Sequence, residues 1–130
     1  MAGPERASVT QPPTRVLIVD DNVDAAEALA AFLELEGCAA RVATDPMAAL
    51  DVLGQFRPEV AVLDIGLPEM DGYELAARIR ASEVGAACRL IAVTGYGMAD
   101  DRARTQAAGF AVHLVKPVDL DALVRAVRQA

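Results

Sequence analysis

The sequence predicts a single α/β domain with a doubly wound, five-stranded parallel sheet and helices on both faces. Short apolar or β-branched runs alternate with segments of helical period along most of the chain. Three of these runs are continuously apolar, which is typical of parallel strands that are buried on both faces. With 130 residues, of which 54% are hydrophobic, the chain has the size of one domain with one core.

The N-terminal 14 residues differ from the rest because they hold three of the seven prolines and show no apolar period. We expect residues 1–14 to form a flexible tail or the end of a linker, and residues 15–130 to form the domain. The predicted strands are Arg15–Asp20, Ala39–Ala43, Val60–Asp64, Leu90–Thr94 and Val112–Val115.

The first two predicted helices have clear beginnings or ends. An apolar stripe after the first strand stops at Gly37, a residue type that suits a left-handed helix terminus. The second helix is expected to begin with Asp45 as the N-cap and Pro46 in the first turn. The stripes consist of Ala25, Leu29, Phe32 and Leu33 in the first helix, and of Ala49, Leu50 and Leu53 in the second.

The last three predicted helices differ in the apolar surface they offer. Leu75 and Ile79 mark a third helix, which follows Asp71 and Gly72. The fourth, around Ala99–Ala108, offers only alanines to the core, so we expect it to be weakly held. The fifth has acidic residues at its start and arginines near its end, which matches the helix dipole. Its buried face is expected to comprise Leu120, Leu123, Val124 and Val127.

Polar residues follow the predicted strands at the edge of the sheet where such folds bind ligands. Strand one ends in Asp20 and Asp21, strand three in Asp64, strand four in Thr94, and strand five in Lys116 and Pro117. Each of these residues alone has an ordinary structural explanation, such as a helix cap or a turn residue. Their joint occurrence at one edge favours a functional site.

Three carboxylates in this position need a compensating cation. At 4 Å, each pair repels by about 1 kcal/mol in water and about 4 kcal/mol at an effective dielectric constant of 20. Lys116 supplies one positive charge. The remaining ligands are oxygens, without sulfur or imidazole, and therefore suit Mg²⁺ rather than a transition metal.

Composition and charge exclude several classes of protein. The net charge is −7, so most of the surface would repel a phosphate backbone, and we expect no direct nucleic-acid binding. No apolar run reaches the roughly 20 residues that a membrane span needs, and the N-terminal segment lacks the apolar core of a signal peptide. We therefore expect a cytoplasmic protein that does not contact a membrane.

The chain resembles the receiver domain of two-component response regulators over residues 15–130. The resemblance is carried by VDDN at 19–22, LDIGLPEMDG at 63–72, AVTGYG at 92–97 and LVKP at 114–117. It implies a flavodoxin-like (βα)5 fold with strand order 2-1-3-4-5, and a phosphoprotein of a phosphorelay. The implied partners are a histidine kinase or a histidine phosphotransfer protein, and an unidentified downstream protein. It also implies a regulatory domain, not an enzyme, that assists its own phosphorylation and dephosphorylation.

The same resemblance implies a role for each residue at the strand ends. Asp64 would be the phosphorylated nucleophile and would bind Mg²⁺ together with Asp21 and the carbonyl of Gly66, while Asp20 would act on the metal through water. Thr94 would hydrogen-bond a phosphoryl oxygen and Lys116 would pair with the phosphoryl group. These roles fit phosphoryl transfer, which depends on positioning and on neutralising spread negative charge. The Lys-Pro bond at this position is cis in the family, so the resemblance implies a cis bond between Lys116 and Pro117.

Three positions depart from the usual receiver pattern or could tune it. His113 stands where receivers usually carry a tyrosine or phenylalanine that moves inward after phosphorylation. It is expected to be either a half-buried strand histidine or an altered switch, and the sequence favours neither. Gly66 and Tyr96 flank the predicted phosphoryl group and could control how water reaches it.

Three other readings compete with a phosphoacceptor. A phosphatase of the haloacid dehalogenase type would carry its nucleophile on strand one in an Asp-x-Asp pattern, which is absent. A flavin carrier would need an uncharged loop after strand one. The possibility of a receiver-like docking module that takes no phosphate stays open, as does the choice between a free-standing regulator and part of a hybrid sensor kinase.

We expect the partner surface to involve the fourth helix, the last strand and the last helix.

Overall fold

The computed structural model describes residues 12–66, 72–95 and 102–129, and these form the predicted doubly wound domain. Five parallel strands pair in the order β2-β1-β3-β4-β5. The strands are β1 (Arg15–Val19), β2 (Ala39–Ala43), β3 (Val60–Asp64), β4 (Arg89–Thr94) and β5 (Phe110–Val115). The helices are α2 (Val23–Leu35), α3 (Pro46–Phe56), α4 (Gly72–Ala81), the 3₁₀ turn η1 (Gly85–Ala87), α5 (Arg102–Ala107) and α6 (Leu120–Arg128).

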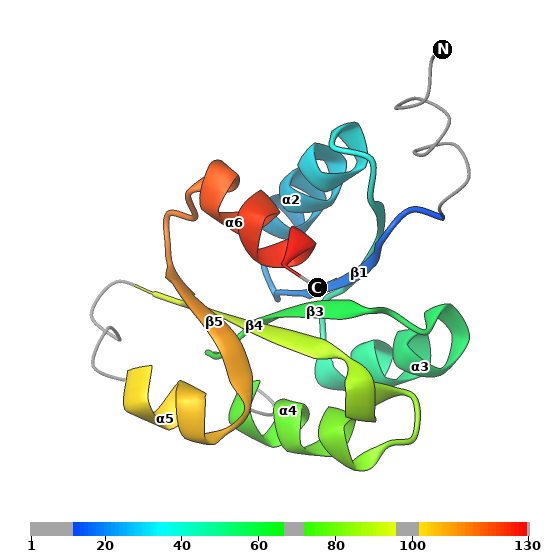
Figure 1. Cartoon of the computed structure of the whole chain (residues 1–130), viewed down its shortest axis with the longest axis vertical. Coiled ribbons are helices and arrows are strands. Elements are labelled where there is room, and N and C mark those ends of the chain that lie inside the picture. The colour runs from blue at the N-terminus through cyan, green and yellow to red at the C-terminus, as the bar shows by residue number, and fades with distance from the viewer. Residues whose placement is uncertain (1–11, 67–71, 96–101, 130) are drawn as a thin grey trace.

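The helices form one layer on each face of the sheet. Figure 1 shows α2 and α6 on one face and α3, α4 and α5 on the other. Alternate strand residues therefore enter two separate cores: Leu17 and Leu63 pack towards α3 and α4, whereas Ile18 and Val62 pack towards α2 and α6. The central strand β3 is buried throughout, as its continuous apolar run predicted.

Side-chain caps fix where three of the helices begin. The Asn22 side chain accepts from the backbone N–H of Ala25 at 3.1 Å, and Asp45 accepts from that of Ala48 at 2.8 Å. Asp119 caps α6 in the same way. The predicted cap at Asp45 and the left-handed Gly37, with φ of 92°, are thus confirmed, whereas the cap at Asp119 is a finding of the structure.

Gly72 is required where α4 approaches the end of β3. A Cβ at this position would lie 2.6 Å from the Cα of Ile65 and 3.1 Å from the carbonyl oxygen of Asp64. The N–H of Gly72 also donates to the carbonyl oxygen of Ile65 at 2.9 Å. A larger residue would therefore displace the backbone beside Asp64.

Some predicted boundaries were wrong by one or two residues. Strand β1 ends at Val19 and not at Asp20, because the Asp20 carboxylate accepts from the N–H of Asn22 and turns the chain. Strand β5 begins at Phe110 and not at Val112, since the buried Phe110 pairs with Leu90 before a register shift.

The prediction that the fourth helix offers only alanines to the core was wrong. Helix α5 runs from Arg102 to Ala107, and residues 99–101 of the predicted helix lie outside the described residues. Among the described side chains of α5, Thr105 is buried with 2% exposure, while Ala103 and Ala107 are exposed. A polar side chain therefore attaches this helix to the sheet.

The predicted tail falls largely outside the described residues, so its character stays a prediction. Within the ranges that the structure does describe, no helix has both the length and the apolar character needed to cross a membrane.

Candidate functional site

The fold brings all the polar residues at the predicted strand ends to one edge of the sheet. Asp64 ends β3 and pairs in register with Val93, so Thr94 follows at the same edge. One carboxylate oxygen from each of Asp20, Asp21 and Asp64 lies within 4.8 Å of the others. Asp20 and Asp64 are buried, whereas Asp21 is exposed. The three carboxylates therefore form one acidic cluster that opens to solvent on the side of Asp21.

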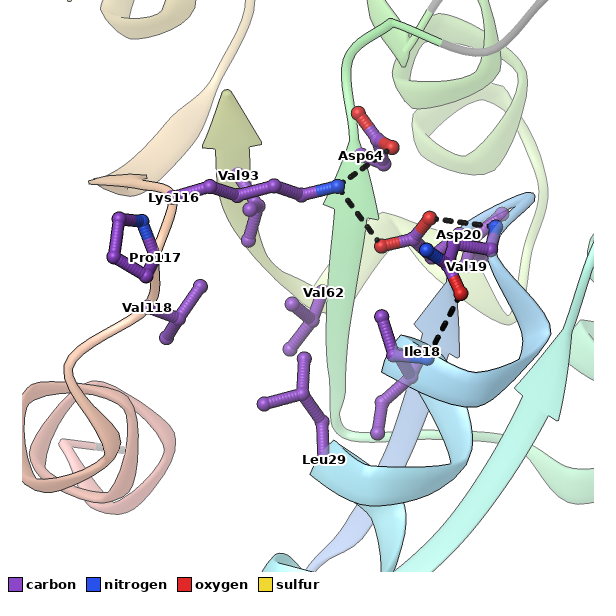
Figure 2. A pocket seen from close by; sticks show the side chains of 12 residues that line it. Ile18, Val19, Asp20, Leu29, Val62, Asp64, Val93, Lys116, Pro117 and Val118 are labelled. Atoms are coloured by element: carbon purple, nitrogen blue, oxygen red, sulfur yellow. Dashed lines mark hydrogen bonds and ion pairs between the residues drawn. The ribbon is translucent and has the colours of Figure 1, made fainter. Parts of the chain in front are cut away.

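Lys116 bridges the two buried carboxylates of this cluster. Its Nζ lies 3.2 Å from Oδ2 of Asp20 and 3.2 Å from Oδ2 of Asp64. Figure 2 shows the side chain extended from the segment after β5, with its ammonium group between the two acids. The backbone N–H of Lys116 donates to the Thr94 carbonyl oxygen at 2.8 Å, and the Lys116–Pro117 bond is cis, as the resemblance implied.

Burial and charge act in opposite directions on these groups. Burial raises the pKa of Asp64, and the Gly66 N–H and the charge of Lys116 oppose this without cancelling it. Burial by itself would lower the pKa of Lys116, but the hydrogen bond to Asp20 and the charge of Asp64 outweigh burial, so its pKa is raised. The Lys116 side chain therefore stays protonated. Deprotonation of Asp64 is disfavoured when no metal is bound.

Backbone N–H groups fix how the two buried carboxylates point. The N–H of Gly66 donates to Oδ1 of Asp64 at 2.9 Å, and the N–H of Asn22 donates to Oδ1 of Asp20 at 2.9 Å. In each carboxylate the other oxygen, Oδ2, is the one that contacts Lys116. A Cβ at Gly66 would stand 3.6 Å from Oδ1 of Asp64, so position 66 directly faces the predicted nucleophile.

A pocket of about 250 Å³ opens beside Asp20, Asp64 and Lys116. Apart from these three residues and Asn22, its lining is apolar and comes from β1, α2, β3, β4 and the segment after β5. These apolar side chains are Ile18, Val19, Ala25, Leu29, Val62, Val93, Pro117 and Val118. Such a wall keeps water from one side of the charges and strengthens their interactions.

The donor set of the acidic cluster fits Mg²⁺. All the candidate ligand atoms are carboxylate oxygens, and the exposed Asp21 leaves one side open to the waters that Mg²⁺ retains. Asp20, Asp21 and Asp64 could hold the ion, with the carbonyl of Gly66 as the further ligand that the resemblance implies.

Thr94 lies at the end of β4, where it is fully buried. Its Oγ1 lies 3.0 Å from Nε2 of His113, and Nδ1 of the same ring lies 3.0 Å from Oγ1 of Thr105. His113 itself is half-buried within β5. Tyr96, the other predicted tuning position, lies outside the described residues.

Thr105 was not predicted from the sequence as part of the site. The signal that could have found it is a single β-branched hydroxyl within a helix that otherwise carries small, charged or amide side chains. Its connection to Thr94 depends on His113 lying between them, which the chain order does not reveal.

Comparison with known proteins identifies the class to which this fold and site belong. Residues 16–128 match the family model described as the response regulator receiver domain. The match covers most of the chain, so the protein belongs to the response regulator receiver domain family and is a regulatory domain of two-component signalling. This membership confirms the predicted receiver class, and the phosphatase and flavin-carrier alternatives are set aside.

Individual relatives agree with this assignment. The chain is 40% identical over 114 residues to an uncharacterized 14.6 kDa protein in the sodA1 3′ region of Leptolyngbya boryana, covering 88% of this chain and 87% of that protein. It is 31% identical to sporulation initiation phosphotransferase F of Bacillus subtilis (strain 168), covering 88% and 91%. It spans only 50% of the length of several other curated relatives.

Solved structures show the same fold. The crystal structure of a response regulator receiver protein from Pseudomonas putida matches with a TM-score of 0.84 at 32% identity. The match covers 93% of this chain and 100% of that chain.

Proposed function

We propose that this receiver domain accepts a phosphoryl group on Asp64 from a histidine kinase or a histidine phosphotransfer protein, in a Mg²⁺-dependent reaction. The observation that carries the proposal is the Lys116 ammonium, which lies 3.2 Å from the carboxylates of both Asp64 and Asp20 inside an all-oxygen acidic cluster. This arrangement holds a carboxylate nucleophile beside a fixed positive charge.

The proposed transfer exchanges one phosphorus bond for another. An Asp64 carboxylate oxygen attacks the phosphorus of a phosphohistidine, the bond from phosphorus to the imidazole nitrogen breaks, and an acyl phosphate remains on Asp64. Lys116 stabilises the negative charge that is spread over the phosphoryl oxygens, and Thr94 donates a hydrogen bond to one of them. When bound, Mg²⁺ supplies further neutralisation of that charge.

We also propose where the domain acts, how it affects its own phosphorylation, and which surface a downstream protein contacts. We place the domain in the cytoplasm, with no direct contact to nucleic acid or membrane, and infer that it assists its own phosphorylation and dephosphorylation. A downstream protein would read the signal at α5, β5 and α6. The attachment of α5 to the sheet through the buried Thr105 supports a change of packing there.

Chemical labelling tests the phosphoacceptor directly. The protein is incubated with acetyl phosphate and Mg²⁺, the product is reduced with borohydride, and peptides are mapped by mass spectrometry. We expect one phosphoryl group per chain and conversion of residue 64 to homoserine, which marks an acyl phosphate. Absence of any label with Mg²⁺ present would favour the docking module that takes no phosphate.

Millimolar Mg²⁺ is expected to raise the melting temperature, because the ion binds only the folded acidic cluster. By mass action the gain is about 2.7 kcal/mol when free Mg²⁺ is about 100 times its dissociation constant. Asp21→Ala should remove most of this increase, as measured by thermal unfolding with and without the ion. Asp24→Ala is the matched control, since Asp24 is an exposed acid in the first turn of α2 and should leave the increase intact.

A further inference from the structure

The imidazole of His113 connects two buried hydroxyl groups. Nε2 lies 3.0 Å from Oγ1 of Thr94 and Nδ1 lies 3.0 Å from Oγ1 of Thr105. Thr94 is fully buried and Thr105 is 2% exposed. The three side chains come from β4, β5 and α5, and they form one hydrogen-bonded chain from the carboxyl edge of the sheet to helix α5, which packs against β5.

The chain can run in two directions, because a neutral imidazole donates from one nitrogen and accepts at the other. If Nδ1 carries the proton, it donates to Thr105, and Nε2 accepts the hydroxyl proton of Thr94. If Nε2 carries the proton, it donates to Thr94, and Nδ1 accepts from Thr105. Only in the second direction does Thr94 keep its own proton for another acceptor without losing its bond to His113.

A phosphoryl group on Asp64 would demand this second direction. Phosphoryl oxygens are acceptors, so the Thr94 hydroxyl has to donate its proton to contact one. Thr94 is fixed next to the site because its carbonyl oxygen accepts from the N–H of Lys116 at 2.8 Å. Its hydroxyl is fully buried, so losing the bond to His113 would leave the ring nitrogen without this partner.

We propose that phosphorylation of Asp64 selects the Nε2–H tautomer of His113, and that His113 and Thr105 are positioning residues that aim the Thr94 hydroxyl at the phosphoryl group. The inference rests on the proposed function. In the phosphorylated state Thr105 donates to Nδ1, Nε2–H donates to Thr94, and Thr94 donates to the phosphoryl oxygen. Aligned in this way, each hydrogen bond polarises the next.

The change of tautomer leaves the number of protons on the His113 ring unchanged, and water can carry the proton between the two ring nitrogens. In moving between the two directions, the ring loses the proton at Nδ1 and gains one at Nε2 by exchange with water, while both hydroxyls rotate. Water can reach the ring, since His113 and Thr105 line a surface hollow of about 440 Å³ together with residues of β5 and α5. Thr105 changes from acceptor to donor in its hydrogen bond with His113. Phosphorylation of Asp64 therefore changes a contact made by α5.

Nitrogen NMR of the ring tests the proposal without ambiguity, because His113 is the only histidine in the chain. Protein labelled with ¹⁵N histidine is studied with Mg²⁺, with and without beryllofluoride as the phosphoryl mimic, at a pH well above the titration range of free histidine. We expect the bound state to show a protonated Nε2 and an unprotonated Nδ1. A bound state with Nδ1 protonated, alone or in an imidazolium, would overturn the proposal.

The fluorine spectrum of the same sample separates this inference from the function on which it rests. If no bound beryllofluoride signal appears, the phosphoacceptor proposal fails and the tautomer proposal fails with it. If beryllofluoride is bound and the ring does not adopt the Nε2–H form, only the tautomer proposal fails.

Variants at Thr105 give a second, quantitative test. Thr105→Val has nearly the same shape but no hydroxyl, and it should lower the ratio of Nε2–H to Nδ1–H tautomer in the beryllofluoride state by about three- to tenfold. Thr105→Ser keeps the hydroxyl donor and should show the same tautomer ratio as the wild type. An unchanged ratio in Thr105→Val would show that Thr105 does not set the tautomer, and would overturn its positioning role.

Discussion

Replacing Asp64 with asparagine is expected to abolish phosphoryl uptake and, at the same time, to raise the melting temperature of the metal-free protein at neutral pH. Uptake is lost because the amide cannot form the acyl phosphate. Stability rises because asparagine removes an ionised group that is buried beside Asp20, while Lys116 keeps its contact with Asp20. Both effects follow from replacing one buried carboxylate with an amide.

The pH dependence of this effect has a defined sign. The pKa of Asp64 is raised by burial, so the folded protein binds the proton more tightly than the unfolded chain does. Stability from this group is therefore greatest at acid pH and falls as the pH rises from the ordinary aspartate pKa through the raised one. The melting temperature gained by Asp64→Asn should grow over the same interval.

The measurement is thermal unfolding in a chelator across that pH range, combined with acetyl phosphate labelling. Asp51→Asn is the matched control, because Asp51 is an exposed acid on α3. It should change neither labelling nor the shape of the pH profile. A metal-free Asp64→Asn that melts below the wild type at neutral pH would contradict the charge argument.

Replacing Lys116 with methionine is expected to make the fold depend on Mg²⁺. Nζ of Lys116 is the cation that contacts both Asp20 and Asp64, so its loss leaves two buried carboxylates without compensation. Breaking a buried ion pair costs about 3–5 kcal/mol, and the 36% exposure of the Lys116 side chain reduces this to about 2 kcal/mol here. Mg²⁺ should recover most of the loss.

The same variant should take up phosphate from acetyl phosphate about 10- to 100-fold more slowly, because a preorganised positive charge at the phosphoryl oxygens is gone. Denaturant unfolding with and without Mg²⁺ measures the first effect, and labelling rates measure the second. Arg125→Met, which removes an exposed cation from α6, is the control for net charge. Equal Mg²⁺ stabilisation in Lys116→Met and wild type would exclude Lys116 as the compensating charge.

The strand ends could be predicted because local sequence encodes them. Continuous apolar runs such as 60–63 identify buried parallel strands, and parallel strands must bring their carboxyl ends to one edge. Asp20, Asp64, Thr94 and Lys116 therefore had to lie near each other once the strands were recognised. The caps at Asp45 and Asp119 were equally local, since each carboxylate accepts from an N–H within three residues.

The boundaries of β5 and the nature of α5 could not be predicted in this way. Strand β5 begins at the buried Phe110, which pairs with Leu90, although the next residue, Ala111, is exposed. Helix α5 has no apolar stripe, because its buried contact is the hydroxyl of Thr105 with an imidazole on a neighbouring strand. Patterns of apolar residues do not record such a contact.

The sequence by itself determined the doubly wound sheet and the set of acids, hydroxyl and ammonium at its edge, since both depend on periodicity and on which residues follow each strand. Only the tertiary structure decided how these groups act on one another. It buried Asp20 and Asp64 but exposed Asp21, placed Lys116 between the two buried acids, and put His113 between Thr94 and Thr105. Burial and hydrogen-bond partners arise from packing between distant segments, and they set the charge state and direction of each group.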